Sequence, residues 1–404
     1  MNTLTQGAGL VRRRFDDVWL ALGLSTGAAV SLGFSRFAYA LLLPAMRDSL
    51  HWTYVQAGGM NTANALGYVL GSAVAAWASE RLGIKRAFLV TLAVSALVLL
   101  LTGGTADYAA LMTLRFVGGF ATAITFVVGA SLAAGINAGK SAAPQRAAIP
   151  LAVYITGVGS GVALSGLVLP PLLARLGAGG WAAGWLALGA IAVAALLPAV
   201  AAVRAVPAQA ARDERVLPWR EFVFLWPTFA NYLLFAAGYV SYMTFVIVLI
   251  RNGGGSATVA AAFWIVLGIA SVVGTLAWGR ALARLGLRWS SPVVALVVLL
   301  GTLPVLFSHT VAAAFVSAVV FGSSFMAGPT AVTFIVRKLL RPPQWTAALA
   351  ALTVAFAAGQ AIGPLLSGYV SDATGSVGAG LWLSPVLLIA AALVAPLQPR
   401  REPA

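Results

Sequence analysis

The chain contains 404 residues, of which 61% are hydrophobic and 9% are charged, and its formal net charge is +15. A soluble domain carries about 25% charged residues, so this composition excludes an ordinary soluble protein and predicts a chain that faces lipid over most of its surface. There is no cysteine, and the two histidines, His51 and His309, fall in predicted loops, so we expect no metal site and no cofactor.

Twelve apolar runs follow one another along the chain, and each is long enough for a transmembrane helix, which needs about 20 apolar residues. The runs lack the alternation of a β-barrel, so they predict an all-α membrane protein with twelve transmembrane helices. They cover residues 18–46, 53–79, 86–104, 107–135, 147–174, 181–203, 222–250, 257–280, 288–308, 311–336, 345–371 and 377–397.

The basic residues predict the orientation of these helices. Of the 25 Lys and Arg residues, two fall within spans (Arg36 and Arg115), three fall on one side of the membrane (Arg47, Arg175 and Arg251), and the rest fall on the side of the termini. Cytoplasmic loops carry the excess of Lys and Arg, so we expect a multi-pass inner-membrane protein with both termini in the cytoplasm. Basic residues beside lipid headgroups also explain the net charge without a nucleic-acid partner.

The chain repeats itself once. Gly71, Arg81 and Gly83 return as Gly274, Arg284 and Gly286, always 203 positions later. We therefore expect two pseudo-symmetric six-helix halves, residues 1–203 and 222–404, joined by a cytoplasmic linker at 204–221. Parallel repeats of this kind occur in one large architecture of secondary transporters.

Several motifs resemble those of the major facilitator superfamily (MFS). Glu80-Arg81-Leu82-Gly83-Ile84-Lys85-Arg86 resembles its loop signature, although Glu replaces Asp and Ile84 replaces a basic residue, and Arg115-x-x-x-Gly119 resembles a motif of its fourth helix. The stretches Gly33-x-x-Arg36-Phe37-Ala38-Tyr39-x-x-Leu42-Leu43-Pro44-x-Met46 and Asn64-x-x-Gly67-Tyr68-x-x-Gly71 are similar to the YbfB/YjiJ-type branch, whose members are largely uncharacterised bacterial transporters.

The resemblance implies the MFS fold and a gating role for the loop motif and its repeat: Glu80, Arg81, Gly83, Lys85, Arg284, Gly286 and Arg288. Glu80 could pair with basic residues across the bundle when one conformation closes. The alternative is a solvated charge cluster that only fixes topology.

The two arginines within spans carry the prediction of a substrate. Arg36 lies 10 residues from Met46, or ~15 Å, and Arg115 lies 8 residues from Asp107, or ~12 Å. No acidic residue lies deep in a span, so an anionic substrate would be the natural partner for a guanidinium. Alternatively, backbone carbonyls satisfy Arg115, and carbonyls near Pro44 or outward snorkelling satisfy Arg36.

The second half has no matching charge. The resemblance places spans one, four, seven and ten around a central cavity, and we expect aromatic and polar side chains there to hold the body of the substrate, although such side chains can also face lipid or pack. The candidates beside the two arginines are Tyr39, Tyr239, Tyr242, Phe325 and Gln360, with Asn64, Tyr68 and Tyr154 as second-line candidates.

Together these patterns predict a secondary active transporter, working as a monomer, that moves a small organic anion, such as a carboxylate, by alternating access. If protons are coupled, we expect them to travel on the substrate as in a symport. One alternative is an exporter of lipophilic or neutral compounds. A non-transporting receptor or scaffold would need larger soluble segments than the linker at 204–221, and an enzyme is not expected because no catalytic set can be assembled.

Overall fold

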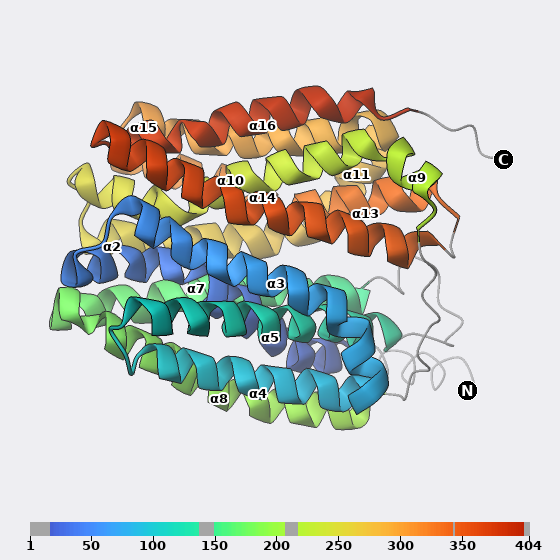
Figure 1. Ribbon diagram of the computed structural model, residues 1–404, viewed down its shortest axis with the longest axis horizontal. Coiled ribbons are helices and arrows are strands. Elements are labelled where there is room, and N and C mark those ends of the chain that lie inside the picture. The colour runs from blue at the N-terminus through green and yellow to red at the C-terminus, as the bar shows by residue number, and fades with distance from the viewer. Residues whose placement is uncertain (1–16, 137–148, 207–216, 342–343, 400–404) are drawn as a thin grey trace, which may run out of the picture.

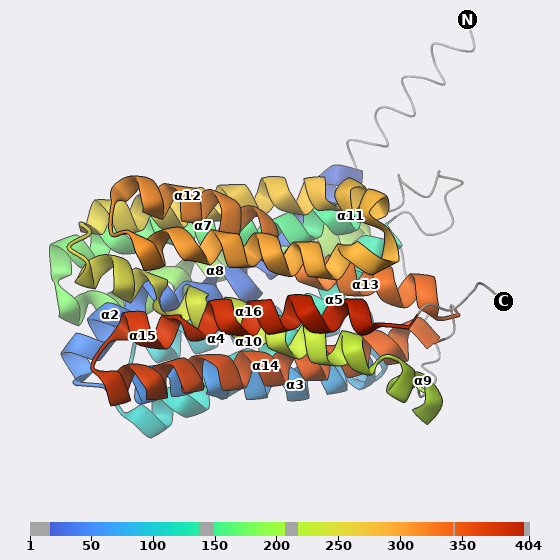
Figure 2. The same ribbon diagram turned by 90° about the horizontal axis from the view of Figure 1, so that it is seen from above.

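The computed structural model describes residues 17–136, 149–206, 217–341 and 344–399, and these residues form helices and no strand. The helices run side by side along the long axis of the molecule (Figures 1 and 2). The first and last described residues lie at the same end of the bundle (Figure 1). We call this end proximal, and the opposite end, where α2 leads into α3 and α14 leads into α15, distal.

The first half of the bundle begins with a crossing in three parts. It consists of an α-helix over 17–28, a π-helix η1 (Ala29–Phe37) and the α-helix α2 (Tyr39–Leu50). The helices that follow are α3 (Tyr54–Leu82), α4 (Ile84–Thr102), α5 (Tyr108–Gly135), α7 (Ile149–Leu176), the short η2 (Ala178–Gly180) and α8 (Trp181–Ala205).

The second half begins after the segment 207–216, which takes up most of the predicted linker and lies outside the described residues. Its helices are α9 (Trp219–Phe224), α10 (Trp226–Asn252), α11 (Ala257–Phe307), α12 (Val311–Ser324), α13 (Ala327–Leu339), α14 (Trp345–Thr374), α15 (Val377–Leu381), α16 (Leu383–Val394) and η4 (Ala395–Leu397).

The number of crossings agrees with the sequence. Ten helical stretches among the described residues are long and apolar enough to span a membrane. One of them, α11, folds back at Gly286 and makes two crossings, and the 29-residue α3 adds another although its polar residues keep it out of the ten. The prediction of an all-α membrane protein with twelve spans is therefore confirmed, with ends that differ by a few residues.

The internal repeat is visible in the packing of glycines. A Cβ on Gly71 would collide with the carbonyl oxygen of Phe120, and a Cβ on Gly274 would collide with that of Ser323. Both members of the second pair lie 203 positions after those of the first. The crossing of α3 with α5 in one half and of α11 with α12 in the other is therefore the same close approach of helix backbones, which only glycine permits.

Gly83 and Gly286 are the turn residues of the two repeated loops. Their φ angles are 77° and 68°, in the region that residues with a Cβ rarely adopt. Each glycine reverses the chain at the proximal end, between α3 and α4 and within α11. The conformation of the turn is thus sufficient to explain both glycines, whether or not the loops also gate transport.

The two halves are closed against each other at the distal end. Every residue of the first crossing from 30 to 43 is buried, and so is every residue of α10 from Phe235 to Ile250. Nearer the proximal end, Phe229, Leu233 and Leu234 of α10 are only half-buried. The inter-half contacts join α3 to α14, α7 to α11 and α2 to α10. The first crossing and α10 are therefore surrounded by other helices in the distal part of the bundle.

Candidate functional site

The π-helix η1 shapes the first crossing at the candidate site. At its end the backbone N–H of Ala38 donates to the carbonyl of Gly33 five residues earlier, at 2.9 Å. Gly33 faces Gly161 of α7, where a Cβ would lie 2.7 Å from the Gly161 Cα atom. The helix is therefore widened where it touches its neighbour most closely, and π-helical turns of this kind are frequent at functional sites.

Arg36 lies in this widened turn and has no acceptor in the described part of the protein. Its side chain is 5% exposed, and it forms no hydrogen bond or ion pair with the described residues. Its guanidinium carbon lies 5.3 Å from the ring centroid of Tyr68 on α3, and its charge also acts on Tyr239 of α10. Arg36 is thus a buried cation with an aromatic partner on α3 and a tyrosine of the second half within electrostatic range.

Gln360 continues this cluster on the side of the second half. Its Nε2 donates a hydrogen bond to the Tyr239 hydroxyl. Its Oε1 is fully enclosed and has no hydrogen-bond partner among the described residues. Because a buried polar atom without a partner costs free energy, the amide oxygen is a second polar group, beside Tyr239, whose bonding needs the described residues do not meet.

Aromatic rings from both halves lie next to this polar cluster. Phe325, at the α12–α13 junction, packs edge-on against Phe37 at 5.6 Å between centroids and lies 6.0 Å from Tyr239. The ring of Phe356 on α14 stacks on Tyr239 at 5.8 Å. The surroundings of Arg36 thus combine one charge, one free amide arm and an apolar aromatic wall.

Arg115 is equally buried, but the first half provides acceptors for it. Its Nη1 donates to the carbonyl of Ser35, its Nη2 to Asn61 Oδ1 at 3.1 Å, and its Nε to the carbonyl of Met60 at 3.4 Å. The rings of Tyr39 and Trp185 flank the guanidinium. Arg115 therefore holds η1 and α3 together.

The other predicted tyrosines belong to packing within one half. The Tyr39 hydroxyl donates to the carbonyl of Ala57 at 2.9 Å. The Tyr242 hydroxyl bonds to Ser317, which in turn donates to the carbonyl of Gly301 at 2.6 Å. Of the seven predicted substrate contacts, the structure brings together Arg36, Tyr239, Phe325 and Gln360, and places Tyr39, Arg115 and Tyr242 in contacts of their own.

Sequence reasoning missed three members of the site or its surroundings and ranked one too low. Phe37 lies in the quoted motif but had no assigned role, Tyr68 was a second-line candidate, and Phe356 and Asn61 were not considered. Phe356 precedes Gln360 by four positions, and residues four apart share a helix face, so this spacing could have found it. Asn61 had no comparable signal.

The repeated loops lie at the proximal end. Within the part of the chain that the structure describes, Glu80, Arg81, Lys85 and Arg284 form no ion pair, and Arg288 packs over the ring of Trp289 at 5.3 Å. In the same part of the chain, no three His, Cys, Asp or Glu side chains are grouped as metal ligands would be. The cross-bundle pairing of Glu80 is therefore not made among the described residues in this conformation.

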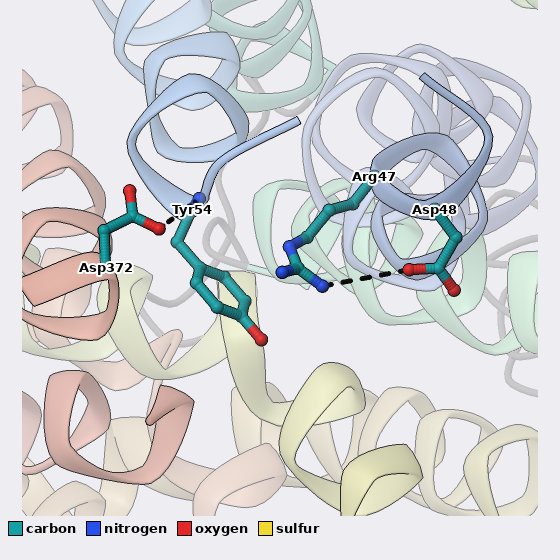
Figure 3. A network of polar contacts seen from close by, with 4 residues as sticks. All are labelled: Arg47, Asp48, Tyr54 and Asp372. Atoms are coloured by element: carbon teal, nitrogen blue, oxygen red, sulfur yellow. Dashed lines mark hydrogen bonds and ion pairs between the residues drawn. The ribbon is translucent and has the colours of Figure 1, made fainter. Parts of the chain in front are cut away.

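A carboxylate joins the two halves at the distal end (Figure 3). Asp372, near the end of α14, accepts hydrogen bonds from the backbone N–H groups of Tyr54 and Val55, both at 2.8 Å. These groups belong to the first turn of α3, where N–H groups have no partner within the helix and favour a negative charge. Deeper in the same interface, Asn61 of the first half donates to Thr244 of the second at 2.6 Å.

The sequence model of one protein family, described as uncharacterised MFS-type transporter YbfB, matches residues 28–396. This chain belongs to that family. No curated protein matches this MFS-type transporter.

Solved structures of other MFS transporters share the fold. One is a bacterial homolog of the human lysosomal transporter Spinster, in an inward-facing and unoccupied conformation, with a TM-score of 0.73, 16% identity, and coverage of 96% of this chain and 97% of that one. Another is a mutant form of the nucleoside transporter NupG, with a TM-score of 0.73, 14% identity, and coverage of 94% of this chain and 98% of that one. At these identities the likeness shows the fold alone. Together with the family match, it makes the chain an MFS-type transporter rather than an enzyme.

Proposed function

We propose that this MFS-type transporter moves a small organic monoanion with an apolar or aromatic body across the membrane by alternating access, and that Arg36 binds the anionic group. The observation that carries the proposal is the buried Arg36, 5% exposed and without an acceptor among the described residues. A guanidinium binds a carboxylate through two parallel hydrogen bonds. A bound carboxylate would therefore accept hydrogen bonds from the Arg36 guanidinium, which has no acceptor among the described residues.

The free energies involved indicate that contacts within the protein do not fully offset the cost of burying Arg36. A charged side chain within a membrane span costs about 2.5–3.5 kcal/mol or more. A cation–π contact such as the one with Tyr68 returns about 0.5–2 kcal/mol. The remaining cost is the kind that a bound anion offsets, whereas Arg115 already has three acceptors.

The second half contributes the contacts to the body of the substrate. Phe325 and Phe356 offer apolar faces, and the free arm of the Gln360 amide offers one hydrogen bond. We propose that Arg115, Tyr39 and Tyr242 position these groups rather than touch the substrate. Since one charge faces an aromatic wall, a monoanion fits better than a dianion.

The aromatic wall also supports a second candidate, an exporter of lipophilic or neutral compounds. Such a compound would occupy the space beside Phe37 and Phe325 and would not need Arg36. The two structural neighbours are described as a lysosomal transporter homolog and a nucleoside transporter, and both descriptions fit organic cargo. The two candidates differ in their dependence on the charge of Arg36.

The orientation belongs to the same proposal. We infer that the proximal end, which holds all but three of the loop Lys and Arg residues, faces the cytoplasm, that the protein resides in the inner membrane as a monomer, and that residues 1–203 and 222–404 move as two halves about the linker 204–221. The closed distal end then corresponds to an inward-facing state. Protons, where coupled, would travel on the acid itself.

The test is uptake into proteoliposomes that contain the full chain. Radiolabelled benzoate and hexanoate are compared with their neutral amides for wild type, Arg36→Gln, Arg36→Lys and the exposed control Arg204→Gln. We expect acid uptake to fall at least tenfold in Arg36→Gln, to recover partly in Arg36→Lys, and to stay unchanged in Arg204→Gln. Equal uptake by a folded Arg36→Gln variant would refute the anion role and favour the neutral exporter.

A further inference from the structure

A cavity lies between the two halves at the distal end. Its volume is about 390 Å³, and its walls come from α2, the end of α7, η2, the end of α10 and the start of α11. Leu41, Pro170 and Ile247 give it an apolar lining, while Arg47, Asp48 and Arg251 supply its charges. The cavity is thus amphipathic, with residues from both halves in its wall.

The two arginines of this cavity are incompletely paired. The side chain of Arg47 forms no hydrogen bond with the described residues. Its guanidinium stands 3.8 Å from the Asp48 carboxylate and lies over the Tyr54 ring at 3.9 Å (Figure 3). Its Nε is enclosed and without a partner among those residues. Arg251 is exposed and donates one hydrogen bond, from Nη1 to the carbonyl of Gly255 at 2.9 Å. The lining therefore holds one carboxylate and two guanidinium groups that retain free donors.

The position of these arginines is also unexpected from topology alone. Among the described loop residues, the basic ones at the distal end are Arg47, Arg175 and Arg251, a small number because basic residues are disfavoured in loops that cross the membrane. Two of the three line the same cavity, one from each half. A shared function in binding negative charge accounts for this pairing better than topology does.

We propose that this distal cavity is a separate binding site for small carboxylates with a short apolar chain. The carboxylate binds Arg47 and Arg251, and the chain lies against the lining around Leu41 and Ile247. Arg47 follows Arg36 by 11 residues, about 16 Å along the helix, so the site is distinct from the central one.

Occupancy of this site stabilises the closed distal end. A ligand shifts a conformational equilibrium by its difference in affinity for the two states. The wall of the cavity is divided between the halves, so separating them at the distal end would remove one arginine from the ligand. A bound carboxylate therefore slows transport without competing for Arg36. This regulation requires alternating access but not the proposed substrate of the central site.

Single cysteines test the charge of the cavity, because the chain contains none of its own. Ala178→Cys places a thiol in the wall, and Ala312→Cys at the exposed start of α12 is the matched control. The rates of reaction with an anionic (ethylsulfonate) and a cationic (ethylammonium) methanethiosulfonate are compared in the full-length protein. We expect the anionic reagent to be favoured about tenfold more at residue 178 than at residue 312, and the preference to vanish with Arg47→Gln plus Arg251→Gln.

Protection by hexanoate separates this site from the central one. We expect hexanoate to slow labelling of Ala178→Cys in the wild-type and Arg36→Gln backgrounds and in the control Arg175→Gln, but not in Arg251→Gln, an exposed substitution that spares the fold. No charge preference at residue 178, absence of protection, or protection that depends on Arg36 would each overturn the proposal. Loss of transport in Arg36→Gln with protection intact bears on the central site alone.

Discussion

Arg36 and Arg115 are buried to nearly the same degree, at 5% and 4% exposure, but of the two only Arg115 donates hydrogen bonds to the described residues. Removing Arg115 takes a donor from the carbonyls of Ser35 and Met60 and leaves Asn61 Oδ1 without the guanidinium that donates to it. Each buried group left unsatisfied costs about 1–3 kcal/mol. We expect Arg115→Met to lower the free energy of unfolding by about 3 kcal/mol or more.

Arg36→Met makes the matched comparison, because it removes a charge that lacks an acceptor among the described residues. We expect the melting temperature of this variant in detergent to be equal to or above that of wild type, while that of Arg115→Met falls. Thermal unfolding followed by tryptophan fluorescence measures both. Equal losses in the two variants would mean that Arg36 has an acceptor within the protein, which contradicts its role as a free anion anchor.

Tyr239 and Tyr242 allow a second comparison on one helix. Tyr239→Phe removes the hydroxyl that accepts from Gln360, and we expect the KM for the acid transported by wild type to rise about tenfold, equivalent to about 1.4 kcal/mol, beside a loss of about 1 kcal/mol in stability. Tyr242→Phe removes a bond to Ser317 inside the second half, and we expect a loss of about 1 kcal/mol in stability with KM unchanged. An unchanged KM in Tyr239→Phe together with a raised KM in Tyr242→Phe would contradict this prediction and assign the substrate contact to Tyr242.

At the residue scale, the sequence could identify the candidates but not their partners. Arg36 stands out because a charged side chain within an apolar run costs free energy, and the run itself is visible in the sequence. The acceptors of Arg115 are backbone carbonyls and an asparagine more than fifty positions earlier, and no pattern in the sequence signals that they lie together. Tyr39 and Tyr242 look like Tyr239 in the sequence. Only the structure shows that the Tyr239 hydroxyl bonds to Gln360, whereas those of Tyr39 and Tyr242 bond to Ala57 and Ser317.

At the scale of helices, the repeat was predictable because backbone contact requires glycine. Gly71 and Gly274 follow from that rule, as do the turns at Gly83 and Gly286. The π-helix η1 was not predictable, because no pattern in its sequence distinguishes it from an α-helix, and its close contact between Gly33 and Gly161 joins residues far apart in the chain. The polar face of α3 was visible, but that it packs on α14 was not.

The contact of Asp372 with the first turn of α3 is the clearest inter-half contact at the distal end. Asp372→Ala removes the acceptor of two N–H groups, and a hydrogen bond to a charged group contributes about 1.5–3 kcal/mol. We expect the equilibrium to shift toward opening at the distal end. A single cysteine in place of Leu41, 4% exposed between the halves, should then react at least tenfold faster with an anionic thiol reagent.

Asp107→Ala is the control for this experiment. Asp107 caps α5 through a 2.8 Å bond to the N–H of Ala110, entirely within the first half. Loss of this cap should destabilise a helix end without changing the reactivity of residue 41. If both variants raise the reactivity alike, the effect is general loosening, and the Asp372 contact does not control the distal end.

The whole molecule combines a closed distal end with repeated loops that form no ion pair in its described part at the proximal end. A transporter that works by alternating access has its two halves in contact at one end and apart at the other. Closed distal contacts, together with proximal loops that form no ion pair with the residues that the structure describes, fit one such state. The absence of an ion pair from Glu80 or Arg284 to any described residue is consistent with loops that pair only after the halves rock. The Asp372 contact would break in the same movement.

Charge asymmetry gives the last prediction, which concerns the molecule in its membrane. Because most of the described Lys and Arg residues outside the spans lie in the proximal loops, these loops should remain in the cytoplasm. Intact cells are treated with a membrane-impermeant thiol reagent. We expect labelling of single cysteines at the exposed distal residues Ala178 and Ala312, and none at the exposed proximal residues Arg81 and Arg284 until the membrane is permeabilised. Labelling of residues 81 and 284 in intact cells would reverse the topology, and the distal carboxylate site would then face the cytoplasm.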